Sequence, residues 1–279
     1  MAGQIVVAVD GSAPAAAALE WAAADAERRR LDLRIVHVGD SWPYDERAEY
    51  CRTTLENAAD RARELAEGVK VGTELLTGNV IDALIGESRQ ADTLVLGSRG
   101  LGGFTGMVVG SVGMGVAGHA SGPVVVVRDP AAGAHGRVVV GYDGSDHAQA
   151  AMAYAVEQAR ARRSELHVVS AWQVPMPAPY AFAYAPLIAE ALEEESRAAR
   201  ARILPWQQSH PDITITHEEL HTHPVAALVQ AARTADLVVV GSRGLGGFAS
   251  AVLGSVSHGV LHHVSCPVAV VRPRGSEAS

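Results

Sequence analysis

The chain carries the stretch Ile5-Val6-Val7-Ala8-Val9-Asp10-Gly11-Ser12, and it carries a close copy at Val138-Val139-Val140-Gly141-Tyr142-Asp143-Gly144-Ser145. An apolar run that ends in Asp-Gly-Ser is typical of a buried strand followed by the start of a helix. A second stretch, Gly97-Ser98-Arg99-Gly100-Leu101-Gly102-Gly103-Phe104, recurs without change at 241–248. The 279 residues therefore consist of two copies of one unit of about 140 residues.

Each copy alternates short apolar runs with longer stretches of helical periodicity. In the first copy we expect strands near 4–9, 33–38, 69–76, 92–97 and 123–128, and helices near 13–30, 46–67, 80–90 and 111–120. This alternation predicts an α/β fold in which helices cover both faces of a parallel sheet. We expect one domain at 1–130 and a second at 136–274, because Pro, Ala and Gly break the pattern between them.

Three segments call for separate expectations. The offset between the copies is 133 residues at Asp10 and 144 at Gly97, so the second copy holds an insertion, which contains a Pro-rich stretch at 175–186. Three glycines fall within the expected helix 111–120. Each interior glycine costs a helix about 1 kcal/mol relative to alanine, so we expect this helix to be short or mobile. The tail after Arg272 is expected to be frayed.

Composition excludes several classes of partner. The formal net charge of −8 argues against nucleic acid and membrane surfaces as partners. Cys51 and Cys266 occupy non-equivalent places in the two copies, and so few cysteines suggest a reducing compartment. We find no signal peptide and no apolar run near the roughly 20 residues that span a bilayer. The prediction is a soluble, cytoplasmic protein.

The glycine pattern after the fourth strand is the strongest functional signal. It reads Gly97-x2-Gly100-x9-Gly110-Ser111, and it recurs at Gly241, Gly244, Gly254 and Ser255. Glycines at a strand end allow positive φ and let backbone N–H groups approach a phosphate, and the helix that follows favours anions at its start. The alternative is that the glycines only turn the chain and that Ser111 and Ser255 are N-caps.

Charged residues near these loops allow two interpretations each. Asp10 and Asp143 can accept hydrogen bonds from ribose hydroxyls or hold Mg²⁺ indirectly, but each can equally be a helix N-cap. Arg99 and Arg243 can pair with phosphate oxygens, or they can point to solvent or to the other half.

Histidines are numerous in the second copy. His258, His262 and His263 fall on one expected helix, and His217, His221 and His223 cluster near the third strand. Zinc needs three or four converging ligands, and the first copy lacks the matching set. We therefore expect solvent-facing histidines and no direct metal site.

The motif order resembles the universal stress protein family, in its tandem, ATP-binding branch. Asp-Gly-Ser follows the first strand, the glycine pattern follows the fourth, and Gly122-Pro123 and Cys266-Pro267 precede the fifth. The resemblance covers essentially the whole chain, once per half. It implies two flavodoxin-like, Rossmann-like domains, each a five-stranded parallel sheet of order 3-2-1-4-5. It also implies ATP with its phosphates in the glycine loop, and a role in stress or growth regulation.

The residues expected to bind the nucleotide come from the glycine motif and from the positions that the resemblance marks as adenosine contacts. In the first copy they are Ala8, Asp10, Val38, Gly97, Ser98, Arg99, Gly100, Leu101, Gly102, Gly103, Gly110, Ser111 and Val112. In the second copy they are Gly141, Asp143, Ala171, Gly241, Ser242, Arg243, Gly244, Leu245, Gly246, Gly247, Gly254, Ser255, Val256 and Ser257.

Three functions fit this pattern. The first is an ATP-binding regulator that acts through a protein partner, with Mg²⁺ near Asp10 and Asp143. The second is a slow ATPase or nucleotide-dependent transferase, for which those two aspartates are the only base candidates. The third is a scaffold with empty sites. The fifth strands of the two copies are apolar edges, so we expect them to pair in an intrachain pseudo-dimer; a homodimer is also compatible with the sequence.

Overall fold

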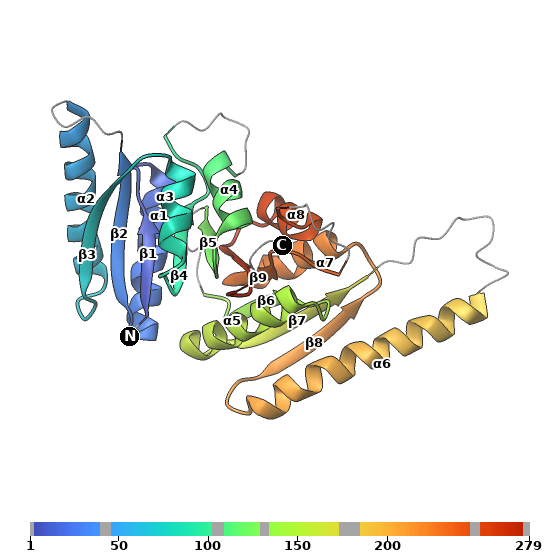
Figure 1. Ribbon diagram of the computed structural model, residues 1–279. Coiled ribbons are helices and arrows are strands. Elements are labelled where there is room, and N and C mark those ends of the chain that lie inside the picture. Colours follow the sequence, from blue (N-terminus) through green and yellow to red (C-terminus); the bar gives the residue numbers. More distant parts are fainter. Residues whose placement is uncertain are drawn as a thin grey trace.

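The computed structural model describes residues 3–39, 46–101, 109–128, 134–172, 185–245 and 252–275. Its first half contains β1 (Gln4–Ala8), α1 (Ala13–Arg29), β2 (Asp32–Gly39), α2 (Glu46–Leu65), β3 (Val71–Thr77), α3 (Val80–Ser88), β4 (Thr93–Gly97), α4 (Ser111–His119) and β5 (Val124–Val127). Its second half contains β6 (Arg137–Gly141), α5 (Asp146–Arg162), β7 (Glu165–Ala171), α6 (Ala185–Ser209), β8 (Ile215–Leu220), α7 (Pro224–Ala231), η2 (Ala232–Thr234), β9 (Leu237–Gly241), α8 (Ser255–His263) and β10 (Val268–Val271). The two halves follow the same order of elements, as the repeat predicted (Figure 1).

All the strands described join one mixed sheet, in the order β3-β2-β1-β4-β5-β10-β9-β6-β7-β8. Each half has the predicted order 3-2-1-4-5, with parallel neighbours throughout. The halves join where β10 pairs antiparallel with β5, with Val268 opposite Val126. The predicted pairing of the two fifth strands is therefore confirmed, and it makes the chain an intrachain pseudo-dimer.

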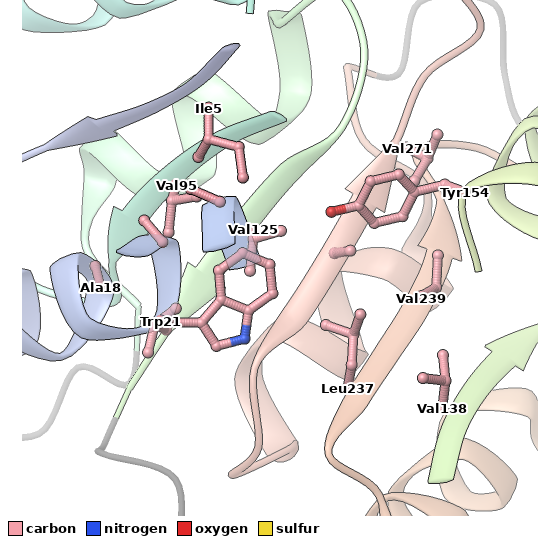
Figure 2. Close-up of a cluster of buried hydrophobic side chains, with 14 of the residues drawn as sticks. Ile5, Ala18, Trp21, Val95, Val125, Val138, Tyr154, Leu237, Val239 and Val271 are labelled. Carbon is pink, nitrogen blue, oxygen red and sulfur yellow. The ribbon is translucent and has the colours of Figure 1, made fainter. Parts of the chain in front are cut away.

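The sheet separates two hydrophobic cores, and each core runs across both halves. One core packs α1, α2, α5 and α6 against one face, and the other packs α3, α4, α7 and α8 against the opposite face. Figure 2 shows part of the first core, where Ile5, Val95 and Val125 of one half face the same layer as Val138 and Val271 of the other. Since the burial of apolar surface drives folding, this continuity ties the halves into one unit.

Buried charges also join α1 to α5 across the junction. Asp25 is completely buried and lies 3.5 Å from Arg29 and 3.4 Å from Arg162. Gln158 occupies the equivalent place in α5 and donates a hydrogen bond of 3.0 Å to Asp25. The carboxylate is thus shared by guanidinium groups from both halves, as a buried charge requires.

One sequence expectation about local order is wrong within the described residues. The tail is not frayed as far as Gly275, because the guanidinium of Arg274 donates to the carbonyls of Ala91 and Asp92 at 2.6 and 3.1 Å. Helix α4 contains nine residues, as many as its counterpart α8, so its glycines do not shorten it relative to the second half. No helix within the described ranges is both long enough and apolar enough to cross a bilayer.

Candidate functional site

A cavity of about 640 Å³ lies at the carboxyl ends of the strands in the second half. This volume lies within the usual range for small-molecule sites, and the carboxyl edge is where open α/β sheets bind ligands. The cavity brings together most of the residues predicted from the second copy: Gly141, Asp143, Ala171, Gly241, Arg243, Gly244, Leu245, Gly254, Ser255, Val256 and Ser257. Gly246 and Gly247, like Gly102 and Gly103 of the first copy, lie outside the described residues.

The site prediction did not name eight further residues that line the cavity. They are Tyr142, Ala148, Val169, Pro224, Leu228, Val240, Leu253 and His258. Leu228 reaches the cavity floor from α7, and its Cδ1 lies 3.0 Å from the position of an added Cβ on Gly141. The periodicity of α7 predicts that such a leucine is buried, but only the fold shows which end of the sheet it faces.

The start of α8 forms one wall of the cavity. Its N-cap is Gly254, which has no side chain to cap the helix, and Ser255 is the first helical residue. Gly110 and Ser111 have the same places at the start of α4. The alternative that Ser111 and Ser255 are N-caps is therefore wrong. First-turn N–H groups have no carbonyl partner within their own helix, so this wall presents donors and a positive dipole end to an anion.

Asp143 connects the end of β6 to the glycine loop. Its Oδ1 accepts from the backbone N–H and the hydroxyl of Ser145 at 3.0 and 2.7 Å, and its Oδ2 accepts from the N–H of Leu245 at 3.0 Å. Ser145, not Asp143, caps α5, through a bond of 3.2 Å from Ala148. The N-cap alternative for the aspartate is wrong, and its role is to hold the two loops of the cavity together.

The first half repeats this arrangement. Asp10 accepts from the N–H groups of Ser12 and Leu101, both at 3.0 Å, and Ser12 caps α1. The hydroxyl of Tyr50, on α2, donates to the carbonyl of Asp10 at 2.9 Å. The equivalence of the two aspartates therefore extends from the sequence to the hydrogen bonds that they make.

The glycines of the motif are needed because other parts of the chain pack closely against them, and not because their backbone angles are unusual. An added Cβ on Gly97 would lie 2.7 Å from the carbonyl carbon of Pro14, and one on Gly241 would lie 2.8 Å from that of His147. A Cβ on Gly100 would lie 2.5 Å from Oδ2 of Asp10. Among the described residues of the two loops none has positive φ. Gly11 and Gly144, in the Asp-Gly-Ser stretches after β1 and β6, do have positive φ. The expectation of positive φ after the fourth strand is thus wrong for the part of each loop that the structure describes.

The two loop arginines occupy different environments. Arg243 lines the cavity and is half-buried, and its Nε is buried without a hydrogen-bond partner in the part of the chain that the structure describes. Arg99 is exposed. Burial, followed by the positive charges of Arg272 and Arg243, lowers the pKa of the neighbouring His147 below its usual value. Two arginines therefore lie close to His147 at the edge of the second cavity, together with Asp143 and Asp146.

The remaining predicted residues lie at the edges of the two sites. Ser98 and Ser242 are buried, and their N–H groups extend the sheet by donating to Val127 and Val271. The hydroxyl of Ser257 donates to the carbonyl of Gly241 at 2.6 Å. The residues Ala8, Val38 and Val112 of the first half are partly buried and pack against the second core.

The histidines have separate surroundings. The rings of His258 and His262 lie 4.6 Å apart on α8, His217 bonds to Ser170 at 3.0 Å, and His223 caps α7. Within the described ranges, no three histidine, cysteine or carboxylate side chains converge as a metal site would require. His223 is exposed although it caps α7, as the sequence led us to expect. His217 is partly buried and bonded to Ser170, so the expectation of a solvent-facing histidine is wrong for His217.

The doubled sheet, joined at its fifth strands and with paired loops at its carboxyl edges, defines a tandem flavodoxin-like α/β protein. The chain belongs to the universal stress protein family, which matches residues 1–128 and again residues 135–272.

Several known proteins are similar to this chain. The universal stress protein Rv1996 of Mycobacterium tuberculosis is 34% identical to this chain, and the alignment covers 96% of this chain and 94% of that protein. The crystal structure of a universal stress protein from Archaeoglobus fulgidus has the same fold over 98% of this chain and 97% of its own, with a TM-score of 0.70 and 22% identity. Shorter universal stress proteins have been solved with cAMP and, from A. fulgidus, with dAMP; they cover 45% and 44% of this chain and 97% and 96% of their own, at 26% and 28% identity, with TM-scores of 0.38 and 0.37.

Proposed function

We propose that each half binds ATP at the carboxyl edge of its sheet, and that the protein is a cytoplasmic, nucleotide-dependent regulator of stress response or growth. The observation that carries this proposal is the cavity of about 640 Å³ that gathers the glycine loop, the start of α8 and Arg243 in the second half. The matching hydrogen bonds of Asp10 and Asp143 support an equivalent site in the first half. The proposed domains are 1–130 and 136–274.

The walls of the cavity suggest how the nucleotide lies. Val169, Ala171 and Leu228 give one apolar side, which suits a purine base. Ser255 and Val256 lie in the first turn of α8, and Arg243 lies nearby; together they suit phosphate oxygens. Asp143 stands between these two sides, and its Oδ2 accepts one bond, so a lone pair remains for a ribose hydroxyl.

We expect Mg²⁺ to be bound mainly by the phosphates. Hard cations prefer oxygen ligands, but both oxygens of Asp143 already accept hydrogen bonds from Ser145 and Leu245. The carboxylate therefore suits a contact to the ion through water. Its share in holding the ion would be secondary to that of the triphosphate.

The same hydrogen bonds argue against a fast enzyme. A general base needs a carboxylate that is free to take a proton, whereas Asp10 and Asp143 hold the loops together. We expect Mg²⁺-ATP turnover below about 0.1 s⁻¹, which is low for an enzyme. Steady turnover above that rate, lost on replacing both aspartates with alanine, would favour the ATPase or transferase instead.

The test of the site is a comparison of ATP and AMP binding by calorimetry. Arg243→Gln removes the guanidinium that we assign to the outer phosphates, so we expect about a tenfold or greater loss of ATP affinity in the second half and a much smaller loss of AMP affinity. Arg233→Gln is the matched control, because Arg233 is an exposed arginine on η2 in the same half. Equal losses for ATP and AMP, or no binding by the parent, would contradict the proposal.

A further inference from the structure

Helix α4 links the two proposed nucleotide sites. Its first turn, at Ser111, is the phosphate-facing helix start that we assign to the first half. Its last turn contacts the loop that leads into α8 of the second half. An added Cβ on Gly118 would overlap the side chain of Val252, and Val252 lies two residues before the N-cap Gly254. Figure 1 shows α4 beside the second half at this junction.

Arg272 ties the same two segments together. It follows β10, and its guanidinium donates to the carbonyl of Gly118 in α4 and, at 3.1 Å, to the carbonyl of Val252. One side chain thus joins the end of a helix in the first half to the approach of the glycine loop in the second. Hydrogen bonds from a charged group are among the stronger ones in proteins.

The contact is reciprocal. Arg128 follows β5, as Arg272 follows β10, and it donates to the carbonyl of Leu261 in the last turn of α8. Cations favour helix C-termini. Arg272 of the second half therefore anchors α4, whose first turn serves the first site. Arg128 of the first half anchors α8, whose first turn serves the second site. The junction therefore connects the two sites in both directions.

We infer that the two nucleotide sites are coupled, with Arg272 and Gly118 as positioning residues that transmit the occupancy of the first site to the loop of the second. The inference rests on the proposed function. A ligand at Ser111 fixes α4, and a fixed α4 holds Val252 and the loop that leads to Gly254. The second ligand then meets a start of α8 that is already held in place, which gives positive coupling.

Native mass spectrometry of the full chain with ATP measures the coupling through the populations with zero, one and two nucleotides. The useful ratio is the squared population with one nucleotide, divided by the product of the populations with none and with two. If the two sites are independent, this ratio is at least about four, whatever their affinities. Positive coupling lowers the ratio. We expect the ratio to lie below about four for the parent, and at or above about four for variants in which the junction is cut.

Arg272→Ala and Val252→Ala cut the junction in different ways. Arg272→Ala removes the hydrogen bonds to the carbonyls of Gly118 and Val252. Val252→Ala only shortens a half-exposed side chain, so it provides a folded variant even if Arg272→Ala does not fold. Arg274→Ala is the matched control, because Arg274 also bonds across the halves, at Ala91 and Asp92 away from the sites. We expect both junction variants to raise the ratio and the control to leave it unchanged.

Two outcomes overturn the inference in distinguishable ways. If ATP fills both sites and the ratio is the same in the parent, the junction variants and the control, the coupling is wrong and the proposed function stands. If the parent binds no ATP, the proposed function fails and the coupling fails with it.

Discussion

Replacing Asp25 with asparagine removes a buried negative charge that arginines of both halves share. Asp25 is completely buried, and the side chain of Arg162 beside it is only 11% exposed. Arg29 keeps a second carboxylate, Asp92 at 2.7 Å, but among the described residues Asp25 is the carboxylate within ion-pair distance of Arg162. Removing one partner of a buried pair costs about 3–5 kcal/mol. Because Arg29 is compensated, we expect a loss of about 3 kcal/mol in the free energy of unfolding.

Urea denaturation followed by circular dichroism measures this loss. Glu157→Gln is the matched control: Glu157 also pairs with Arg29, at 3.3 Å, but its side chain is 58% exposed. An exposed pair contributes less than about 1 kcal/mol. If Asp25→Asn cost no more than Glu157→Gln, the buried charges would not stabilise the junction and the reasoning would be refuted.

Two further predictions concern packing and pH. Gly97→Ala places a Cβ against the backbone of the first turn of α1, so we expect it to lower the free energy of unfolding by about 1–3 kcal/mol; Gly72→Ala, whose Cβ meets nothing within 4 Å, should be neutral in the same melts. Burial is the largest of the causes that lower the pKa of His147, His217 and His262 from 6.5. As the pH falls, these histidines take up protons in the unfolded chain before they do so in the folded chain. The free energy of unfolding is therefore highest above pH 6.5, and it decreases as the pH falls from 6.5 through the pKa values of the folded chain. Urea midpoints that do not change between about pH 7.5 and about pH 5.5 would contradict this.

Local patterns were sufficient to predict most of the fold. Buried Val and Ile runs mark the strands, and the Asp-Gly-Ser stretches mark where α1 and α5 start, because these signals depend on neighbours in the chain. The N-caps themselves are Ser12 and Ser145, and not the aspartates that the sequence offered. The repeat and the apolar fifth strands together predicted the pairing of β5 with β10. The sequence does not show which residues make contact when they are far apart in the chain.

The candidate site shows this limit clearly. The glycine motif located the loop, but the reason for Gly97 is Pro14 on another element, and the reason for Gly100 is the carboxylate of Asp10. The difference between Arg99 and Arg243 was also out of reach, since their sequence contexts are identical and only their surroundings differ. Contacts of this kind are set by tertiary packing and not by local propensity.

The most direct test of the proposed site is a crystal structure of the full chain grown with Mg²⁺ and ATP. We expect a nucleotide in the second half, with phosphate oxygens at the N–H groups of Ser255 and Val256 and at the guanidinium of Arg243, and with its ribose at Asp143. A nucleotide bound elsewhere, or an unchanged cavity at saturating ATP, would contradict it.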